Sequence, residues 1–426
     1  MKKIGERKLD YSWVMIALCF IMVFIVLGFC SSAKSIYISP ICDALGISRS
    51  AYSLNETFRY ITTSVVNVFF GSLIMRFGTK KLIISGFLSL IVCMFIYSFA
   101  TNVFMFYLGA VFMGIGFSFT TTTMVGAVVN KWCTENRGTI TGFILAANGV
   151  GAALAMQILS PIINNPEDIF GYRASYRLVA IILAAVTFFM ILLFRENPPK
   201  KSFSTTVPKK EDTKKKSKID NNWQGIPLSI ALRRWYFYAM ALCIFFIGMV
   251  LQGIFGISAP HLKDVGLSSE YVAWVLSFNS ILLTCSKFMT GFLYDRFGLR
   301  LTSGFCLVSA IAVTVIMLNI NPTPEGKTFA FVYAVLVAIA LPLETVMLSI
   351  FVNDLFGHAD FNKILGIYAS VTTVGFALGA PCANLCYDIL GNYNVVFYTS
   401  MIIISGVTIL IQFIITSAHK ERKKVL

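Results

Sequence analysis

Five ionisable side chains lie inside long apolar stretches of the sequence. Lys287 and Glu344 are in the C-terminal half, and Lys34, Glu56 and Arg59 are in the N-terminal half. A charge at the depth of a lipid bilayer is costly, so it usually pairs with an opposite charge, belongs to a proton relay or lines a pathway. These five residues are therefore the first candidates for chemistry.

Lys287 stands about seven residues from the end of its apolar stretch, roughly 10 Å at 1.5 Å per residue. A buried ammonium attracts an anion, so Lys287 is a candidate binding residue; a lysine that extends to the membrane surface is the alternative. Glu344 follows Pro342 at a similar depth. Burial favours the neutral carboxyl and a nearby cation favours the carboxylate. Glu344 is therefore a candidate for proton coupling, and a static ion pair or a helix cap is the alternative.

Glu56 and Arg59 are three positions apart, so they share one face of a helix. A mutual ion pair is the simplest interpretation. In the alternative, Glu56 is a second proton-coupling residue and Arg59 attracts an anion. Uncharged polar side chains in other apolar stretches are candidates to orient a ligand by hydrogen bonds, although each also fits a packing role: Asn148, Thr372, Asn279 and Gln252.

The elements that must position these residues are long apolar helices. A helix needs about 20 apolar residues to cross about 30 Å of hydrocarbon. Twelve segments meet or approach that length: 11–33, 52–74, 82–100, 104–129, 139–163, 178–194, 236–259, 271–293, 301–320, 327–353, 364–387 and 395–416. The sequence therefore predicts an all-α membrane protein with 12 transmembrane helices in two six-helix bundles.

The composition supports a membrane protein. Of the 426 residues, 57% are hydrophobic and 13% are charged, whereas a soluble domain has about 25% charged residues. This excludes a soluble enzyme, a disordered chain and a secreted disulfide scaffold. The net charge of +15 lies in loops and tails, so it does not imply a nucleic-acid partner.

The domain boundaries follow from the charge distribution. We predict an N-terminal tail (1–10), a first bundle (11–194), a basic linker (195–235), a second bundle (236–416) and a C-terminal tail (417–426). Of the 35 Lys and Arg residues, 27 lie in segments on the side of the N-terminus and five in the opposite loops. Because cytoplasmic loops are enriched in Lys and Arg, we expect both termini in the cytoplasm. The size of the chain and its short loops favour a bacterial inner-membrane location.

Two internal echoes relate the halves. In the first echo, Gly71, Arg76, Phe77 and Gly78 recur in the second half as Gly291, Arg296, Phe297 and Gly298. In the second echo, positions 142, 150, 151, 153 and 154 recur, with the same residue types, at positions 366, 374, 375, 377 and 378. The two echoes have nearly the same offset along the chain. They therefore predict two halves related by a parallel repeat, an arrangement known in transporters.

These residues resemble the major facilitator superfamily, whose signature loop is G-x-x-x-D-R-x-G-x-R/K. The second copy matches it fully, through Gly291, Asp295, Arg296, Gly298 and Arg300. The first copy keeps Gly71, Arg76 and Gly78 but has Met75 in place of Asp. The resemblance implies a gating motif that latches the cytoplasmic side, and the missing Asp puts the first-half latch in doubt.

Two further segments resemble the monocarboxylate transporter and oxalate/formate antiporter group: residues 130–142, which include Arg137 as a further gating residue, and residues 354–366. This resemblance implies alternating-access transport of a small organic anion, most simply a monocarboxylate. Lys287 stands where the related carriers have an essential Arg, and Lys34 stands where they have a Lys that meets the anion; for Lys34 an interfacial anchor is the alternative. Proton symport and anion exchange both remain open.

The main rival function is export of neutral or cationic compounds such as drugs. An enzyme is not expected, because the sequence has no catalytic cluster and no phosphate-binding G-x-x-x-x-G-K-[ST] loop. We expect no metal or cofactor, since no His/Cys set has ligand spacing. A monomer is the family default.

Overall fold

The structure is a computed structural model that describes residues 11–132, 137–165, 168–197, 225–357 and 359–425. Every regular element in these ranges is helical. The first half contains α1 (Tyr11–Val23), η1 (Phe24–Phe29), η2 (Ser32–Tyr37), α2 (Ile38–Leu45), α3 (Arg49–Phe77), α4 (Thr79–Ser98), α5 (Val103–Thr120), α6 (Thr122–Trp132), α7 (Arg137–Ile163) and α8 (Gly171–Leu193).

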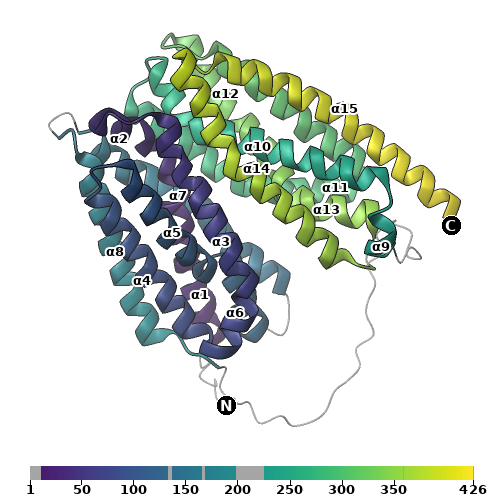
Figure 1. Ribbon diagram of the computed structural model, residues 1–426, viewed down its shortest axis with the longest axis horizontal. Helices are drawn as coiled ribbons and strands as arrows, with labels where there is room; N and C mark the ends of the chain where they lie inside the picture. Colours follow the sequence, from purple (N-terminus) through teal and green to yellow (C-terminus); the bar gives the residue numbers. More distant parts are fainter. Residues whose placement is uncertain (1–10, 133–136, 166–167, 198–224, 358, 426) are drawn as a thin grey trace, which may run out of the picture.

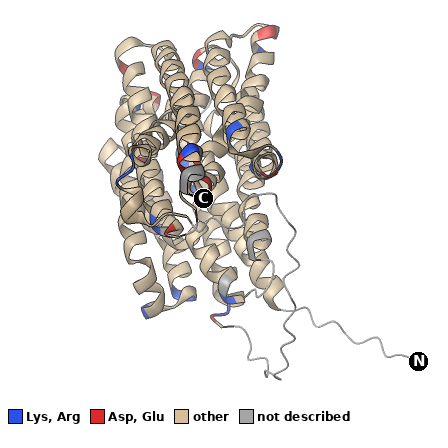
Figure 2. Cartoon of the chain, turned by 90° about the vertical axis from the view of Figure 1, so that its right-hand side faces the viewer, with Lys and Arg blue, Asp and Glu red and all other residues tan. Residues whose placement is uncertain are grey.

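The second half contains α9 (Leu228–Ala231), α10 (Trp235–Asp264), α11 (Ser269–Asn319), α12 (Pro324–Ala340), η3 (Leu341–Glu344), α13 (Val346–Phe356), α14 (Phe361–Leu390) and α15 (Asn394–Val425). Figure 1 shows the two bundles side by side, the first coloured purple to teal and the second green to yellow. In Figure 2 most of the helical surface carries no charged residue, as expected for a protein in lipid.

The described residues form eleven apolar helical segments long enough to cross a membrane. One of them, α11, has 51 residues, about 77 Å at 1.5 Å per residue, which is enough to cross twice. It breaks at Gly298, where φ is +77°, a conformation that glycine adopts at little cost. The prediction of a twelve-helix membrane fold is thus confirmed, with the eighth and ninth spans joined directly at this glycine.

Three predicted spans are not continuous α-helices. The first changes to a π-turn at η1 and a 3₁₀ turn at η2; the fourth breaks at Thr121, between α5 and α6; and the tenth breaks at Thr345, after η3. At the other end of the chain, α15 continues to Val425, through most of the segment predicted as a tail. The basic linker lies mainly outside the described residues.

Glycines let the helices of each half pack closely. A Cβ on Gly151 of α7 would overlap the carbonyl oxygen of Phe24, and one on Gly375 of α14 would overlap that of Phe245. Small residues allow such close helix contacts in membranes. Gly151 and Gly375 are partners in the second echo of the repeat, so both halves use the same packing solution.

Two seams join the halves, α3 with α14 and α7 with α11. The hydrogen bonds along these seams use the N-terminal parts of α3 and α11 and the C-terminal parts of α7 and α14. We call this end of the molecule the Arg49 end, and the opposite end, with Gly78 and Gly298, the Gly78 end. The predicted orientation puts the Gly78 end in the cytoplasm.

Candidate functional site

A cavity of about 440 Å³ lies between the two halves. Residues of α6 and α7 line it from the first half, and residues of α11 and α13 line it from the second half. Near one wall α7 and α11 approach so closely that a Cβ on Gly149 would overlap the Thr284 hydroxyl oxygen. Both halves therefore shape one space.

Lys287 is the ionisable side chain among the described residues that line this cavity. It lies on α11, and the structure shows no hydrogen bond or ion pair between its ammonium and any described residue. An unpaired ammonium in an apolar setting carries a desolvation cost that a bound anion would relieve. The cavity thus has a cationic site with no counter-ion in contact among the described residues.

Glu344 lies beside the cavity, immediately before the lining residues Thr345 and Val346. Its side chain is buried, with 6% of the residue exposed. One carboxyl oxygen accepts a hydrogen bond of 2.6 Å from the Gln252 amide, and the other oxygen has no partner among the described residues. Glu344 lies on η3, which contacts α11, but its side chain is not in ion-pair contact with Lys287.

Lys34, Glu56 and Arg59 form one buried cluster in the first half. A single oxygen of Glu56 accepts hydrogen bonds from the Lys34 ammonium and from Arg59, at 2.6 Å from Nη2 and 3.0 Å from Nε. The Arg59 guanidinium lies 3.9 Å from the ring centre of Tyr60. The sequence prediction of a Glu56–Arg59 pair is confirmed, and Lys34 joins it as a third member.

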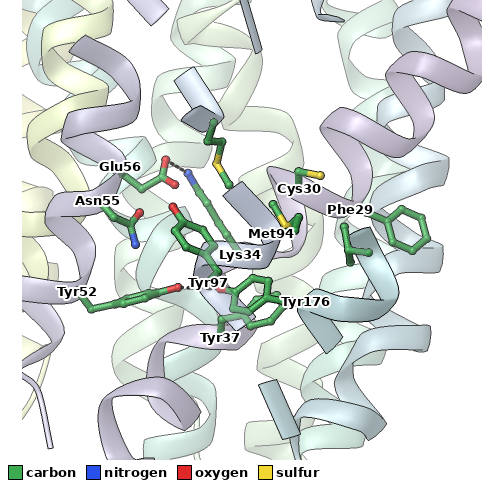
Figure 3. A pocket seen from close by; sticks show the side chains of 12 residues that line it. Phe29, Cys30, Lys34, Tyr37, Tyr52, Asn55, Glu56, Met94, Tyr97 and Tyr176 are labelled. Atoms are coloured by element: carbon green, nitrogen blue, oxygen red, sulfur yellow. Dashed lines mark hydrogen bonds and ion pairs between the residues drawn. The ribbon is translucent and has the colours of Figure 1, made fainter. Parts of the chain in front are cut away.

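The space beside this cluster is too small for an organic substrate. Figure 3 shows Lys34 extending to Glu56, with the rings of Tyr37, Tyr97 and Tyr176 nearby. The pocket has about 20 Å³, which corresponds to about one water molecule. In this conformation the cluster therefore holds its own charges together and is closed to a larger ligand.

The five charged side chains do not cancel. Lys34, Arg59 and Lys287 contribute three positive charges and Glu56 and Glu344 contribute at most two negative ones. With both lysines protonated, the set is therefore at least one unit positive. Because charge at membrane depth is expensive, this excess favours a bound anion.

The uncharged candidates divide into two groups. Asn148 lines the cavity and accepts a hydrogen bond of 3.2 Å from the Ser32 hydroxyl, and Gln252 binds Glu344. Asn279 instead donates to the Ala334 carbonyl at 2.8 Å, between α11 and α12. Thr372 bonds the carbonyl of Tyr368 in its own helix at 2.9 Å. The structure thus brings Asn148 and Gln252 to the central region and places the other two in helix packing.

The break at Thr121 was not predicted from the sequence, and the break at Thr345 was considered only as the helix-cap alternative for Glu344. Thr121 and Thr345 are separated along the chain by the same interval as Gly151 and Gly375, so the fourth and tenth spans break at equivalent positions of the repeat. The helices that start after them, α6 and α13, begin with the cavity-lining residues Thr122 and Val346. A helix N-terminus carries a partial positive charge, and the N-termini of α6 and α13 both border the cavity.

The two copies of the gating motif have the same shape. The φ angle is +81° at Gly78 and +77° at Gly298, and Arg76 and Arg296 each lie 5.4 Å from the ring of the following Phe. Gly71 and Gly291 each have room for a Cβ. Among described residues, Asp295, Arg296 and Arg300 form no ion pair. The side chain of Arg137 lies outside the described residues.

Glu196 is a residue that the sequence prediction did not single out. Its carboxylate accepts hydrogen bonds from the backbone N–H groups of Thr79 (2.9 Å) and Lys80 (2.7 Å), at the start of α4, and from the Lys131 ammonium (2.9 Å). Partial desolvation raises its pKa, but these hydrogen bonds outweigh that effect and hold the pKa of Glu196 at about 2. Glu196 therefore ties α4 and α6 to the segment after α8 at the Gly78 end.

Comparisons with known proteins agree with this architecture. The model of the Major Facilitator Superfamily matches residues 16–323 and 240–425. The uncharacterized MFS-type transporter YcxA of Bacillus subtilis (strain 168) is 26% identical over 149 residues, which are 35% of this chain and 36% of that protein. The match therefore spans about a third of the relative.

Two solved structures share the fold at low sequence identity. The nucleoside transporter NupG superposes with a TM-score of 0.74 at 14% identity, over 97% of this chain and 100% of that one. A bacterial homolog of the human lysosomal transporter Spinster, in an inward-facing and unoccupied conformation, superposes with a TM-score of 0.74 at 15% identity, over 97% and 98% of the two chains.

Proposed function

The chain belongs to the Major Facilitator Superfamily and is a multi-pass membrane transporter of a small molecule, and we propose that its substrate is a small organic anion, most simply a monocarboxylate. Superfamily members are transporters rather than enzymes. The proposed location is the inner membrane, with a monomeric protein and both termini in the cytoplasm.

The observation that carries the proposal is the unpaired ammonium of Lys287 in the cavity between the halves. The N-termini of α6 and α13 border the same cavity, and helix N-termini favour anions. The excess positive charge of the five-residue set points in the same direction. A bound carboxylate would neutralise Lys287 without displacing any partner among the described residues.

The remaining walls suit the organic part of such a substrate. Leu145, Leu283, Phe288 and Val346 provide apolar contacts, and Asn148 provides an amide. Typical small-molecule sites are mostly apolar with a few polar groups, and have volumes of about 300–1,000 Å³. A cavity of about 440 Å³ accommodates a short-chain or aryl carboxylate.

The transport cycle follows from the arrangement of the seams. In this conformation the halves are bonded together at the Arg49 end, so we assign an inward-facing state in which the substrate exchanges with the cytoplasm. Opening of the Arg49 end and closure of the Gly78 end would expose the same cavity to the outside. In that state the exposed Asp295, Arg296 and Arg300 gain the latch role that the family resemblance implies.

Coupling is assigned to Glu344. Its burial, its unpartnered oxygen and its position on η3, which contacts the helix that carries Lys287, suit a carboxyl that gains a proton when a substrate anion occupies the lysine. Anion exchange, which needs Lys287 alone, is the alternative. Glu56 is the weaker candidate because two cations already occupy its carboxylate.

Export of neutral or cationic compounds is the rival function. It would require Glu344 or Glu56 to bind the cation, but neither lines the cavity that contains Lys287. Binding measurements on the purified protein distinguish the two functions, by comparing short and aryl monocarboxylates with lipophilic cations. Saturable binding of carboxylates supports the proposal, and saturable binding of cations alone overturns it.

A further inference from the structure

One hydrogen bond between the halves occurs twice. In the α3–α14 seam, the hydroxyl of Thr57 donates to the backbone carbonyl of Ala377 at 2.5 Å. In the α7–α11 seam, the hydroxyl of Ser277 donates to the backbone carbonyl of Ala153 at 2.9 Å. Each bond joins a short hydroxyl side chain of one half to the backbone of the other, so the two helices must approach closely.

The two bonds are copies related by the internal repeat. Thr57 and Ser277 have the offset of the first echo, which relates α3 to α11, and Ala153 and Ala377 belong to the second echo, which relates α7 to α14. The parallel repeat relates the halves by an axis along the membrane normal. The two bonds therefore lie on opposite sides of that axis and define a line across the molecule.

Nearer the Arg49 end, the N-terminus of α3 makes a different set of contacts, with α10 as well as with α14. The Arg49 guanidinium binds both oxygens of Asp264, the last residue of α10, and stacks 3.9 Å from the ring centre of Tyr387 on α14. The carboxylate of Asp388 accepts the backbone N–H groups of Arg49 and Ser50, at 3.1 and 2.9 Å. An acid of one half thus caps a helix of the other half.

These charged contacts have no copy in the other seam among the described residues. The repeat partner of Arg49 is Ser269, and that of Asp388 is Asn164. At these positions the Ser160 hydroxyl donates a hydrogen bond to the Ser269 carbonyl at 3.3 Å. The side-chain oxygen of Asn164 accepts a hydrogen bond from the Lys263 ammonium at 2.6 Å. The hydroxyl–carbonyl bonds are therefore common to both seams, whereas the ionic contacts surround the N-terminus of α3 alone.

We propose that the Thr57–Ala377 and Ser277–Ala153 bonds are the pivot on which the halves rock, and that the Arg49–Asp264–Asp388 cluster is the latch that holds the Arg49 end closed. Displacement in a rigid-body rotation grows with distance from the axis. Arg49 is eight residues from Thr57, about 12 Å along the helix. A rotation of about 15° would move it about 3 Å, enough to break a hydrogen bond, and leave the pivot bonds nearly in place.

Disulfide cross-links at the two places test the proposal. One variant carries Thr57→Cys with Ala377→Cys, and the matched control carries Arg49→Cys with Asp388→Cys, both without the native cysteines. Dyes on azide-bearing residues at the exposed positions 81 and 301, which lie just after Gly78 and Gly298 and outside the gating motif, report the separation of the halves at the Gly78 end by single-molecule fluorescence transfer. This readout needs no substrate, so its failure is distinct from a failure of the proposed function.

With the latch intact and no cross-link, we expect the distance between the dyes to exchange between two values, a longer one for the open Gly78 end and a shorter one for the closed Gly78 end. In an Arg49→Ala variant we expect a shift towards the shorter distance. The pivot disulfide should leave both separations populated. The latch disulfide should leave only the longer one, and a reducing agent should restore exchange. A frozen separation with the pivot disulfide would overturn the pivot, and an unchanged distribution in Arg49→Ala would overturn the latch.

Discussion

Lys287 and Glu344 lie at the same depth on neighbouring helices of one half and yet do not form an ion pair. Lys287 is eleven positions before the break at Gly298, and Glu344 is twelve positions before the end of α13. The lysine lines the cavity and the glutamate is buried beside it. This separation leaves a cation free to meet a substrate and a carboxyl free to respond to its arrival.

Replacing Lys287 with Ala should reduce the uptake of a transported carboxylate at least tenfold. A hydrogen bond to a charged group contributes about 1.5–3 kcal/mol, and each ~1.4 kcal/mol corresponds to a factor of ten in affinity. Lys287→Arg keeps the charge and should retain part of the activity. Lys327→Ala, at the start of α12, is the control that should transport normally. The measurement is carboxylate uptake into proteoliposomes. Full uptake activity in Lys287→Ala would contradict the assignment of Lys287 as the substrate-binding residue.

Replacing Glu344 with Gln should separate exchange from accumulation. The amide keeps the size and the bond to Gln252 but cannot take up a proton. We expect Glu344→Gln to exchange labelled for unlabelled carboxylate across the membrane at a rate within a fewfold of wild type. Accumulation driven by an imposed pH gradient should be lost. If the variant still accumulates substrate, the proton site lies elsewhere.

The sequence predicted the helices and the repeat because both depend on local signals. Apolar stretches of sufficient length and the two glycines at 78 and 298 are visible in the chain itself. The contact of Lys34 with Glu56 was not predicted, because it depends on how η2 lies against α3, which no local pattern encodes. The two helix breaks differ in this respect. Nothing local marks the break at Thr121, because threonine is tolerated in helices and only the packing around it interrupts the helix. The break at Thr345 follows Pro342, and proline is a local signal for a kinked or broken helix.

The Lys34–Glu56–Arg59 cluster predicts unequal effects on stability. Glu56→Gln leaves two neighbouring buried cations without their counter-ion, and removing one partner of a buried ion pair typically costs about 3–5 kcal/mol. Lys34→Met should cost less, because Glu56 keeps both bonds from Arg59. Thermal unfolding in detergent compares the two. A double variant, Glu56→Gln with Lys34→Met, removes one of the two unpaired cations and should recover part of the stability lost in Glu56→Gln. Equal melting temperatures for all three variants would contradict the role of the cluster.

Glu196 predicts a pH dependence at the Gly78 end. Its pKa is held at about 2 in the folded protein, below its ordinary value of about 4.3. Its contribution to stability is therefore complete above about pH 4.3 and is lost as the pH falls from there towards 2. Glu196→Gln should melt below wild type at pH 7, and the difference should shrink as the pH is lowered through this window. Lys131→Met removes one of the three hydrogen bonds and leaves the two backbone bonds at Thr79 and Lys80, so it should show a smaller loss with the same pH trend. A Glu196→Gln difference that stays constant from pH 7 to pH 3 would show that the carboxylate does not stabilise this end through its charge.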